Sequence, residues 1–112
     1  MNVTYKGYMC DVSFAQYGNG NNAIQLIGSE GTDYEGELVG VASVNGELKL
    51  EDDVVGIKTW SENEGIDQSL IDGGVIEPEL LGLEPTGFVA IEHYKLTAAS
   101  LEEIEKLKEV KS

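Results

Sequence analysis

Few side chains in this sequence of 112 residues could do covalent chemistry. The chain has one histidine, His93, and one cysteine, Cys10. A histidine base needs a nucleophile and an orienting acid, and no serine stands in a Gly-x-Ser-x-Gly nucleophile elbow. One His with one Cys cannot form a standard zinc site. Neighbouring carboxylates such as Glu62 and Glu64 could do acid–base work, but chance alone produces such pairs in so acidic a chain. We therefore predict no catalytic residue.

Two loops match ligand-binding patterns only in part. Residues 18–23 read Gly-x-Gly-x-x-Ala, but a dinucleotide site needs a helix directly afterwards. The apolar run Ala23–Ile27 predicts a strand there instead. The acidic loop that starts at Asp33 has Leu38 and Val44 where an EF-hand loop needs Gly and Glu. The sequence thus predicts a hairpin turn and a solvated loop, with no cofactor and no metal.

The charge of the chain is strongly negative. It holds 21 acids against seven basic residues, all of them lysine, for a net charge of −14. Between Lys58 and Lys95 there are eight acids and no base. Such a surface repels nucleic acid and anionic lipid, because binding to phosphates needs Lys and Arg. The acids either keep the protein soluble or attract a basic protein partner, and the sequence leaves both interpretations open.

Trp60 also has two interpretations. It stands between an apolar strand and the acids Glu62, Glu64 and Asp67. It either packs the start of a helix onto the sheet or serves as an exposed aromatic anchor for a partner.

The cysteine content, the length and the apolar runs of the sequence bear on the cellular compartment and the number of domains. Cys10 alternates with Tyr8, Val12 and Phe14, so we expect a small buried side chain. A lone cysteine forms no internal disulfide. The sequence has no apolar run of the ~20 residues that cross a bilayer and no secretory signal. We expect a single domain spanning 1–112 in a reducing cytosol.

The first half of the chain predicts antiparallel strands. Apolar residues alternate over 8–15, with a tight turn or bulge at Lys6-Gly7 and a turn at 18–22. Strands follow at 23–27 and 38–44, and Asn45-Gly46 predicts a hairpin whose return strand is 47–50. A further strand is expected at 54–60.

The second half predicts two helices and one strand. Ser61 and Ser100 each begin a capping-box pattern, which places helices at about 62–72 and about 101–110. Gly73-Gly74 ends the first helix. The segment 75–85 contains both prolines and is expected to be a loop, followed by a strand at 88–96. The fold class is α+β: a mostly antiparallel twisted sheet of about five or six strands with two short helices.

Four segments carry a family resemblance: 14–20, 42–45, 53–65 and 86–89. In order and spacing they resemble a family of small proteins of unassigned function that are carried by phages, plasmids and conjugative elements. Some relatives resemble anti-CRISPR inhibitors of Cas9-type nucleases. The sequence has Asn21 where the family often has Arg, and Trp60 where it often has Tyr.

The charge and the resemblance together favour a non-catalytic inhibitor in the bacterial host cytoplasm. Its partner would be a basic host protein that handles nucleic acid, such as a CRISPR nuclease with a channel rich in Lys and Arg. The alternative is a non-catalytic accessory protein of a mobile element with no anti-defence role, which could self-associate through an open sheet edge. The expected contact residues are Asp52, Asp53, Trp60, Glu62, Glu64, Asp67 and Asp72.

Overall fold

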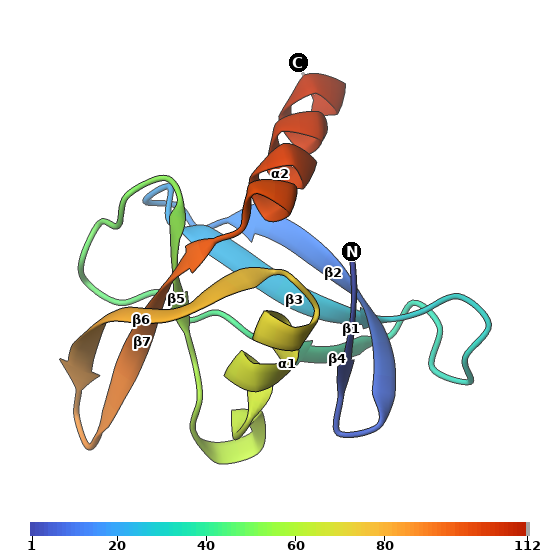
Figure 1. Cartoon of the computed structure of the whole chain (residues 1–112), viewed down its shortest axis with the longest axis horizontal. Coiled ribbons are helices and arrows are strands. Elements are labelled where there is room, and N and C mark those ends of the chain that lie inside the picture. Colours follow the sequence, from blue (N-terminus) through green and yellow to red (C-terminus); the bar gives the residue numbers. More distant parts are fainter. Residues whose placement is uncertain (112) are drawn as a thin grey trace.

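Two antiparallel sheets and two α-helices make up the α+β fold (Figure 1). The computed structural model describes the backbone of residues 1–111 and the side chains of residues 1–109. The first sheet has the strand order β1-β2-β3-β4, formed by β1 (Asn2–Tyr5), β2 (Tyr8–Gln16), β3 (Asn22–Gly28) and β4 (Leu38–Val41). The second has the order β5-β7-β6, formed by β5 (Val54–Ile57), β6 (Ile76–Thr86) and β7 (Val89–Leu96). The described chain thus forms seven strands in two sheets, where five or six in one sheet were expected.

The predicted turns of the first sheet are confirmed. Lys6 and Gly7 both have positive φ (50° and 83°), and they join β1 to β2 with Tyr5 opposite Tyr8. Positive φ at both central residues is the geometry of a type I′ turn, which matches the twist of the flanking strands. Residues 18–21 form the turn between β2 and β3.

The prediction of a hairpin at Asn45-Gly46 with a return strand at 47–50 is wrong. In the structure, residues 45–53 form a loop without a strand. The buried Asn21 side chain holds this loop: it donates to Asn45 Oδ1 (3.0 Å) and to the Leu48 carbonyl (2.8 Å), and it accepts from the Leu50 N–H (2.8 Å). These bonds replace a strand ladder, because they satisfy backbone groups that a hairpin would otherwise pair.

The prediction of a loop at 75–85 is also wrong, because most of this segment belongs to β6, the longest strand. It pairs with β7 along its length, with register irregularities between Ile76 and Leu80 and between Leu80 and Gly82. Pro78 and Pro85 are tolerated because β6 is an edge strand, where a missing N–H need not break the ladder.

The predictions that Ser61 and Ser100 cap the two helices are both wrong. Ser61 begins a short 3₁₀ turn, η1 (Ser61–Asn63), with φ 60°, and α1 (Ile66–Asp72) starts only after Gly65, so the helix expected at 62–72 is split. The second helix, α2 (Ala98–Lys111), begins three residues earlier than expected. Thr97 caps it by accepting the Ser100 N–H through Oγ1 (3.1 Å).

The hydrophobic core lies between the two sheets and α1. Its members are buried apolar side chains from both halves of the chain, among them Ile24, Leu26, Ile57, Leu70 and Leu96. Cys10 is fully buried, as predicted. The Lys58 N–H donates to the Ala42 carbonyl (2.9 Å), which ties the sheets together near β5.

Figure 1 shows α2 projecting from one end of the molecule and the β6–β7 hairpin projecting from one side. In the part of the chain that the structure describes, no helix is both long and apolar enough to cross a membrane.

Candidate functional site

The six acids predicted to bind a partner fall into two groups. Asp52 and Asp53 precede β5, whereas the other four lie after it on one continuous stretch. We call residues 61–72, which span η1 and α1, the acidic segment; it carries Glu62, Glu64, Asp67 and Asp72. The length of β5 therefore separates Asp52 and Asp53 from the acidic segment.

The β1–β2 hairpin fixes the backbone of the acidic segment. The Tyr5 hydroxyl donates to the Glu62 carbonyl (2.7 Å), and the Glu64 carbonyl lies 3.0 Å from the same oxygen. Lys6 Nζ also donates to the Glu62 carbonyl (2.9 Å). From the other side, the buried Asn63 side chain donates to the Val41 carbonyl (2.7 Å). Contacts from distant parts of the chain thus hold the turn that presents these acids.

The acids of the segment differ in their electrostatic state. Lys58 Nζ lies 2.7 Å from Glu62 Oε1, and this hydrogen bond is the main reason that the pKa of Glu62 falls to about 2. Glu64 and Asp72 are exposed, and Gln68 donates to Asp72 (2.8 Å). The carboxylate of Glu62 is consequently partly neutralised and a weak base, which makes it poorly suited to general base catalysis.

Asp67 is turned toward the second sheet. The Tyr94 hydroxyl lies 2.7 Å from Glu92 Oε1 and 3.3 Å from Asp67 Oδ2, and Thr59 Oγ1 donates to Glu92 Oε2 (2.9 Å). Burial, with the adjacent Glu92 and Asp67 carboxylates, raises the pKa of Tyr94. These contacts join the start of α1 to β7.

Trp60 is half-buried, so the structure shows neither a fully packed nor a fully exposed ring. Lys58 Nζ lies 5.9 Å from the ring centroid, within the range of a cation–π contact. The ring thus lies beside the same ammonium group that pairs with Glu62.

Asp52 and Asp53 make only weak surface pairs. Asp52 lies 4.0 Å from Lys49 Nζ, and Asp53 lies 3.7 Å from Lys95 Nζ. Exposed pairs of this kind contribute about 0–1 kcal/mol. Both acids remain available to solvent, but at the opposite end of β5 from Glu62.

A mostly apolar groove of about 840 Å³ lies beside β4. Leu38 and Val41 of this edge strand line it together with three tyrosines and the Lys58–Glu62 pair. Tyr17 and Ser43 face each other in the groove at 3.0 Å, but Ser43 Oγ accepts the Ile24 N–H (2.8 Å) and is buried. The Ser43 hydroxyl is thus part of the backbone bonding of the first sheet.

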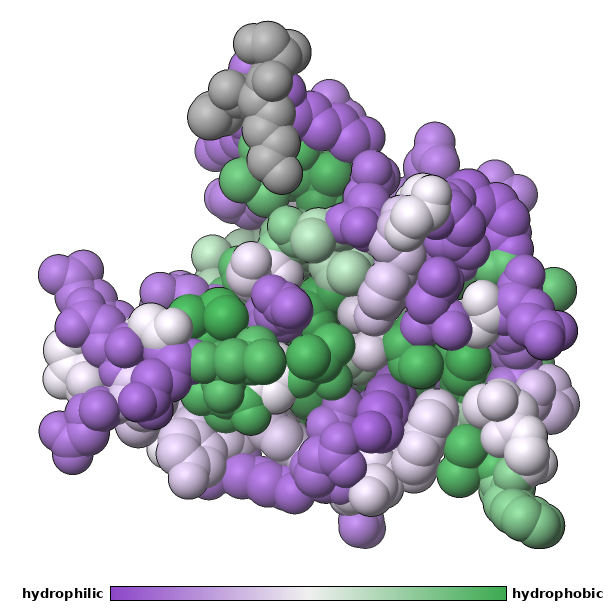
Figure 2. All heavy atoms as spheres, turned by 180° about the vertical axis from the view of Figure 1, so that it is seen from behind, coloured by the Kyte–Doolittle hydropathy of each residue, from purple (hydrophilic) through white to green (hydrophobic). Residues whose placement is uncertain are grey.

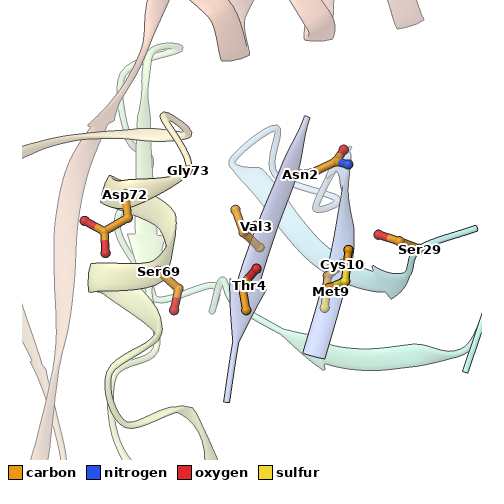
Figure 3. A pocket seen from close by; sticks show the side chains of 9 residues that line it. All are labelled: Asn2, Val3, Thr4, Met9, Cys10, Ser29, Ser69, Asp72 and Gly73. Atoms are coloured by element: carbon orange, nitrogen blue, oxygen red, sulfur yellow. The ribbon is translucent and has the colours of Figure 1, made fainter. Parts of the chain in front are cut away.

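Cys10 lines a second cavity of about 340 Å³ between β1 and α1 (Figure 3). Burial and the neighbouring Asp11 raise the pKa of its thiol, which disfavours the thiolate. Figure 3 shows the Asp72 carboxylate pointing away from this cavity. The arrangement suits a packed, unreactive thiol.

His93 belongs to a contact that fastens the loop 45–53. Its Nε2 lies 3.3 Å from Glu84 Oε1, while Glu84 Oε2 accepts the Glu47 N–H (2.9 Å). Among residues 1–109, no group of three His, Cys, Asp or Glu side chains is arranged to hold a metal ion.

Sequence reasoning missed the exposed apolar side chains of the β6–β7 hairpin. We call this set the apolar strip; it consists of Leu80, Leu81, Leu83 and Phe88. Figure 2 shows hydrophobic side chains at the end of this hairpin, at lower right, as well as over the four-stranded sheet near β4. The sequence Thr86-Gly87-Phe88-Val89 could have indicated this hairpin. A two-residue turn that begins with Gly, between strand-forming residues, is typical of a type II′ hairpin.

No family model, no curated protein and no solved structure matches the chain.

Proposed function

We propose that this protein binds and inhibits a basic host protein that handles nucleic acid, a CRISPR Cas9-type nuclease, in the bacterial cytoplasm. The observation that carries the proposal is the acidic segment: four of the expected contact acids lie on one stretch whose backbone is fixed by Tyr5 and Lys6. The net charge of −14 supports it, because complementary charge raises both the association rate and the specificity of a complex with a basic channel.

The structure refines which acids to test. Asp67 is adjacent to Tyr94 and Glu92, so changing it would disturb the second sheet. Glu62, Glu64 and Asp72 are exposed, and their replacement should leave the core intact.

The test is a DNA-cleavage assay with purified host Cas9 and guide RNA. We expect the wild-type protein to inhibit cleavage, less so at high salt, and the triple variant Glu62→Lys, Glu64→Lys, Asp72→Lys to lose inhibition. The matched control, Glu30→Lys, Glu35→Lys, Glu37→Lys, makes the same change in net charge in the exposed loop between β3 and β4.

Inhibition that falls equally in both variants would assign the effect to net charge and not to the acidic segment. No inhibition by the wild-type protein would overturn the proposed function.

A further inference from the structure

The apolar strip exposes large hydrophobic side chains that the fold does not bury. Leu80, Leu81 and Leu83 are 44%, 50% and 58% exposed, and Phe88 is fully exposed at the tip of the hairpin. Gly87 has a φ of +66° and Phe88 follows it, so the turn itself needs the glycine but not the aromatic ring. Clustered apolar residues in contact with water are typical of an interaction site.

Leu80 and Leu83 of the strip lie on the same side of the second sheet as the start of α1. Leu80 is the cross-strand partner of Tyr94, and Leu83 is the partner of Glu92. Directly opposite residues in a sheet point to the same face. Tyr94 contacts Asp67, and Glu92 contacts Thr59. Leu80 and Leu83 therefore lie on the face that also carries the start of α1.

Pairing of strand edges is an unsuitable way to cover this hairpin. Thr86 and Val89 flank a two-residue turn, so the backbone groups of these two residues are hydrogen-bonded to each other. Because such pairs alternate along an antiparallel ladder, the backbone groups of Pro85 point toward the open edge of the sheet. Pro85 has no N–H to offer there, and Pro78 removes another from the same strand. The register irregularities around Leu80 further interrupt a regular edge. Recognition must therefore use the side chains.

Charge decides between a second copy and another partner. Asp67 of the acidic segment contacts Tyr94, the cross-strand partner of Leu80, so negative charge lies on the same face as Leu80 and Leu83. A second copy would bring another net charge of −14 against this surface, and like charges across an interface are unfavourable. A partner whose apolar pocket is bordered by Lys or Arg complements both the leucines and the acids.

We infer that the apolar strip and the acidic segment form one composite docking surface for a basic protein with an apolar pocket, in which Leu80, Leu83 and Phe88 enter the pocket. This inference rests on the proposed function for the identity of the partner, but not for the chemistry of the surface.

Two synthetic peptides test the chemistry without Cas9. One alternates Lys with Leu and the other alternates Lys with Ser, with the same number of lysines. Binding to the whole protein is followed by ¹⁵N–¹H NMR shifts. We expect the Lys-Leu peptide to bind at least about tenfold more tightly, because buried leucine side chains contribute to its affinity. Its shifts should cluster on β6 and the acidic segment.

Matched variants locate the contact. Leu80→Ser with Leu83→Ser should remove the tenfold preference, whereas Leu38→Ser should keep it; Leu38 is also 58% exposed, on the edge strand β4. Equal binding of the two peptides, or shifts centred on β4, would overturn the inference. So would a wild-type dimer in sedimentation that Leu83→Ser dissociates, because it would make a second copy the occupant.

The Cas9 assay separates this inference from the proposed function. Loss of inhibition in the Leu80→Ser, Leu83→Ser variant supports both. If the wild-type protein does not inhibit Cas9 but shows the leucine-dependent peptide binding, the proposed function fails and the composite surface stands.

Discussion

The two faces of the β6–β7 hairpin differ in what covers them. On one face, Glu84 accepts the Glu47 N–H and contacts His93, and Ile91 is only 2% exposed. On the other face, the start of α1 contacts Tyr94 of β7, whereas Leu80 and Leu83 of the edge strand β6 are largely exposed. The loop 45–53 thus buries one side of the hairpin. Strand pairing alone does not bury a hairpin, because each face needs a covering segment. On the leucine face that cover stops at β7, so the exposed part of β6 is suited to contact another molecule.

Truncating one apolar residue on each face gives the largest expected difference. Ile91→Ala should lower the free energy of unfolding by about 2–5 kcal/mol, because it leaves a cavity in a packed site. Leu83→Ala should change it by no more than about 0.5 kcal/mol, since the side chain is already in water. Urea denaturation measures both. Similar losses in the two variants would contradict the difference between the faces.

The two glycines that flank His93 differ in the space around them. A Cβ at Gly56 would lie 2.9 Å from Ile91 Cγ2 and 3.0 Å from the Val44 carbonyl, whereas a Cβ at Gly82 would meet nothing within 4 Å. Gly56→Ala should destabilise the protein by about 1–3 kcal/mol through overpacking. Gly82→Ala should be neutral or stabilise by about 0.5 kcal/mol, through the unfolded chain. Thermal unfolding of both variants checks this, and an unchanged Tm for Gly56→Ala would contradict the packing described.

Glu84 tests how the covered face is fastened. Glu84→Ala removes the acceptor of the Glu47 N–H and the partner of His93, and it should destabilise the protein by about 1 kcal/mol. Hydrogen exchange of the Glu47 amide should become faster. Glu79→Ala, at an exposed position of the same strand, is the control and should leave that amide unchanged.

The smallest expected effect concerns Glu62 in the acidic segment. Lys58→Met should raise the pKa of Glu62 from about 2 toward its ordinary value, because the hydrogen bond from Lys58 is the main cause of the lowering. Since the pKa is lowered in the folded state, the pairing stabilises the protein at pH values above the ordinary carboxyl pKa, and this contribution is lost as the pH falls toward about 2.

An NMR titration of the Glu62 side chain measures this change. Lys49→Met is the control, because its ammonium lies next to Asp52 at the other end of β5. A Glu62 carboxyl that still titrates near 2 in Lys58→Met would show that Lys58 does not set its pKa.

The elements that depend only on residues close in the sequence were predicted correctly. The turns at Lys6-Gly7 and 18–22 need only residues that accept their backbone geometry, and both are present as expected. The strand β7 and the end of α1 at Gly73 follow in the same way from alternation and from glycine.

Tertiary contacts decided the rest. Asn45-Gly46 is a strong hairpin signal, but the distant side chain of Asn21 holds this loop in another conformation. Pro78 and Pro85 favour a loop, and only the edge position of β6 makes them compatible with a strand. The grouping of Glu62, Glu64 and Asp67 followed from their closeness in the sequence, whereas the separation of Asp52 and Asp53 depends on the direction of β5.

The hydrogen bond from Tyr5 to the Glu62 carbonyl has a consequence for binding. Ordering a loop at an interface costs conformational entropy, and that cost reduces affinity. The acidic segment is already held by Tyr5, Lys6 and Asn63 before any partner arrives. A partner would therefore meet a preorganised surface, and little of the interaction free energy would be lost in immobilising its backbone.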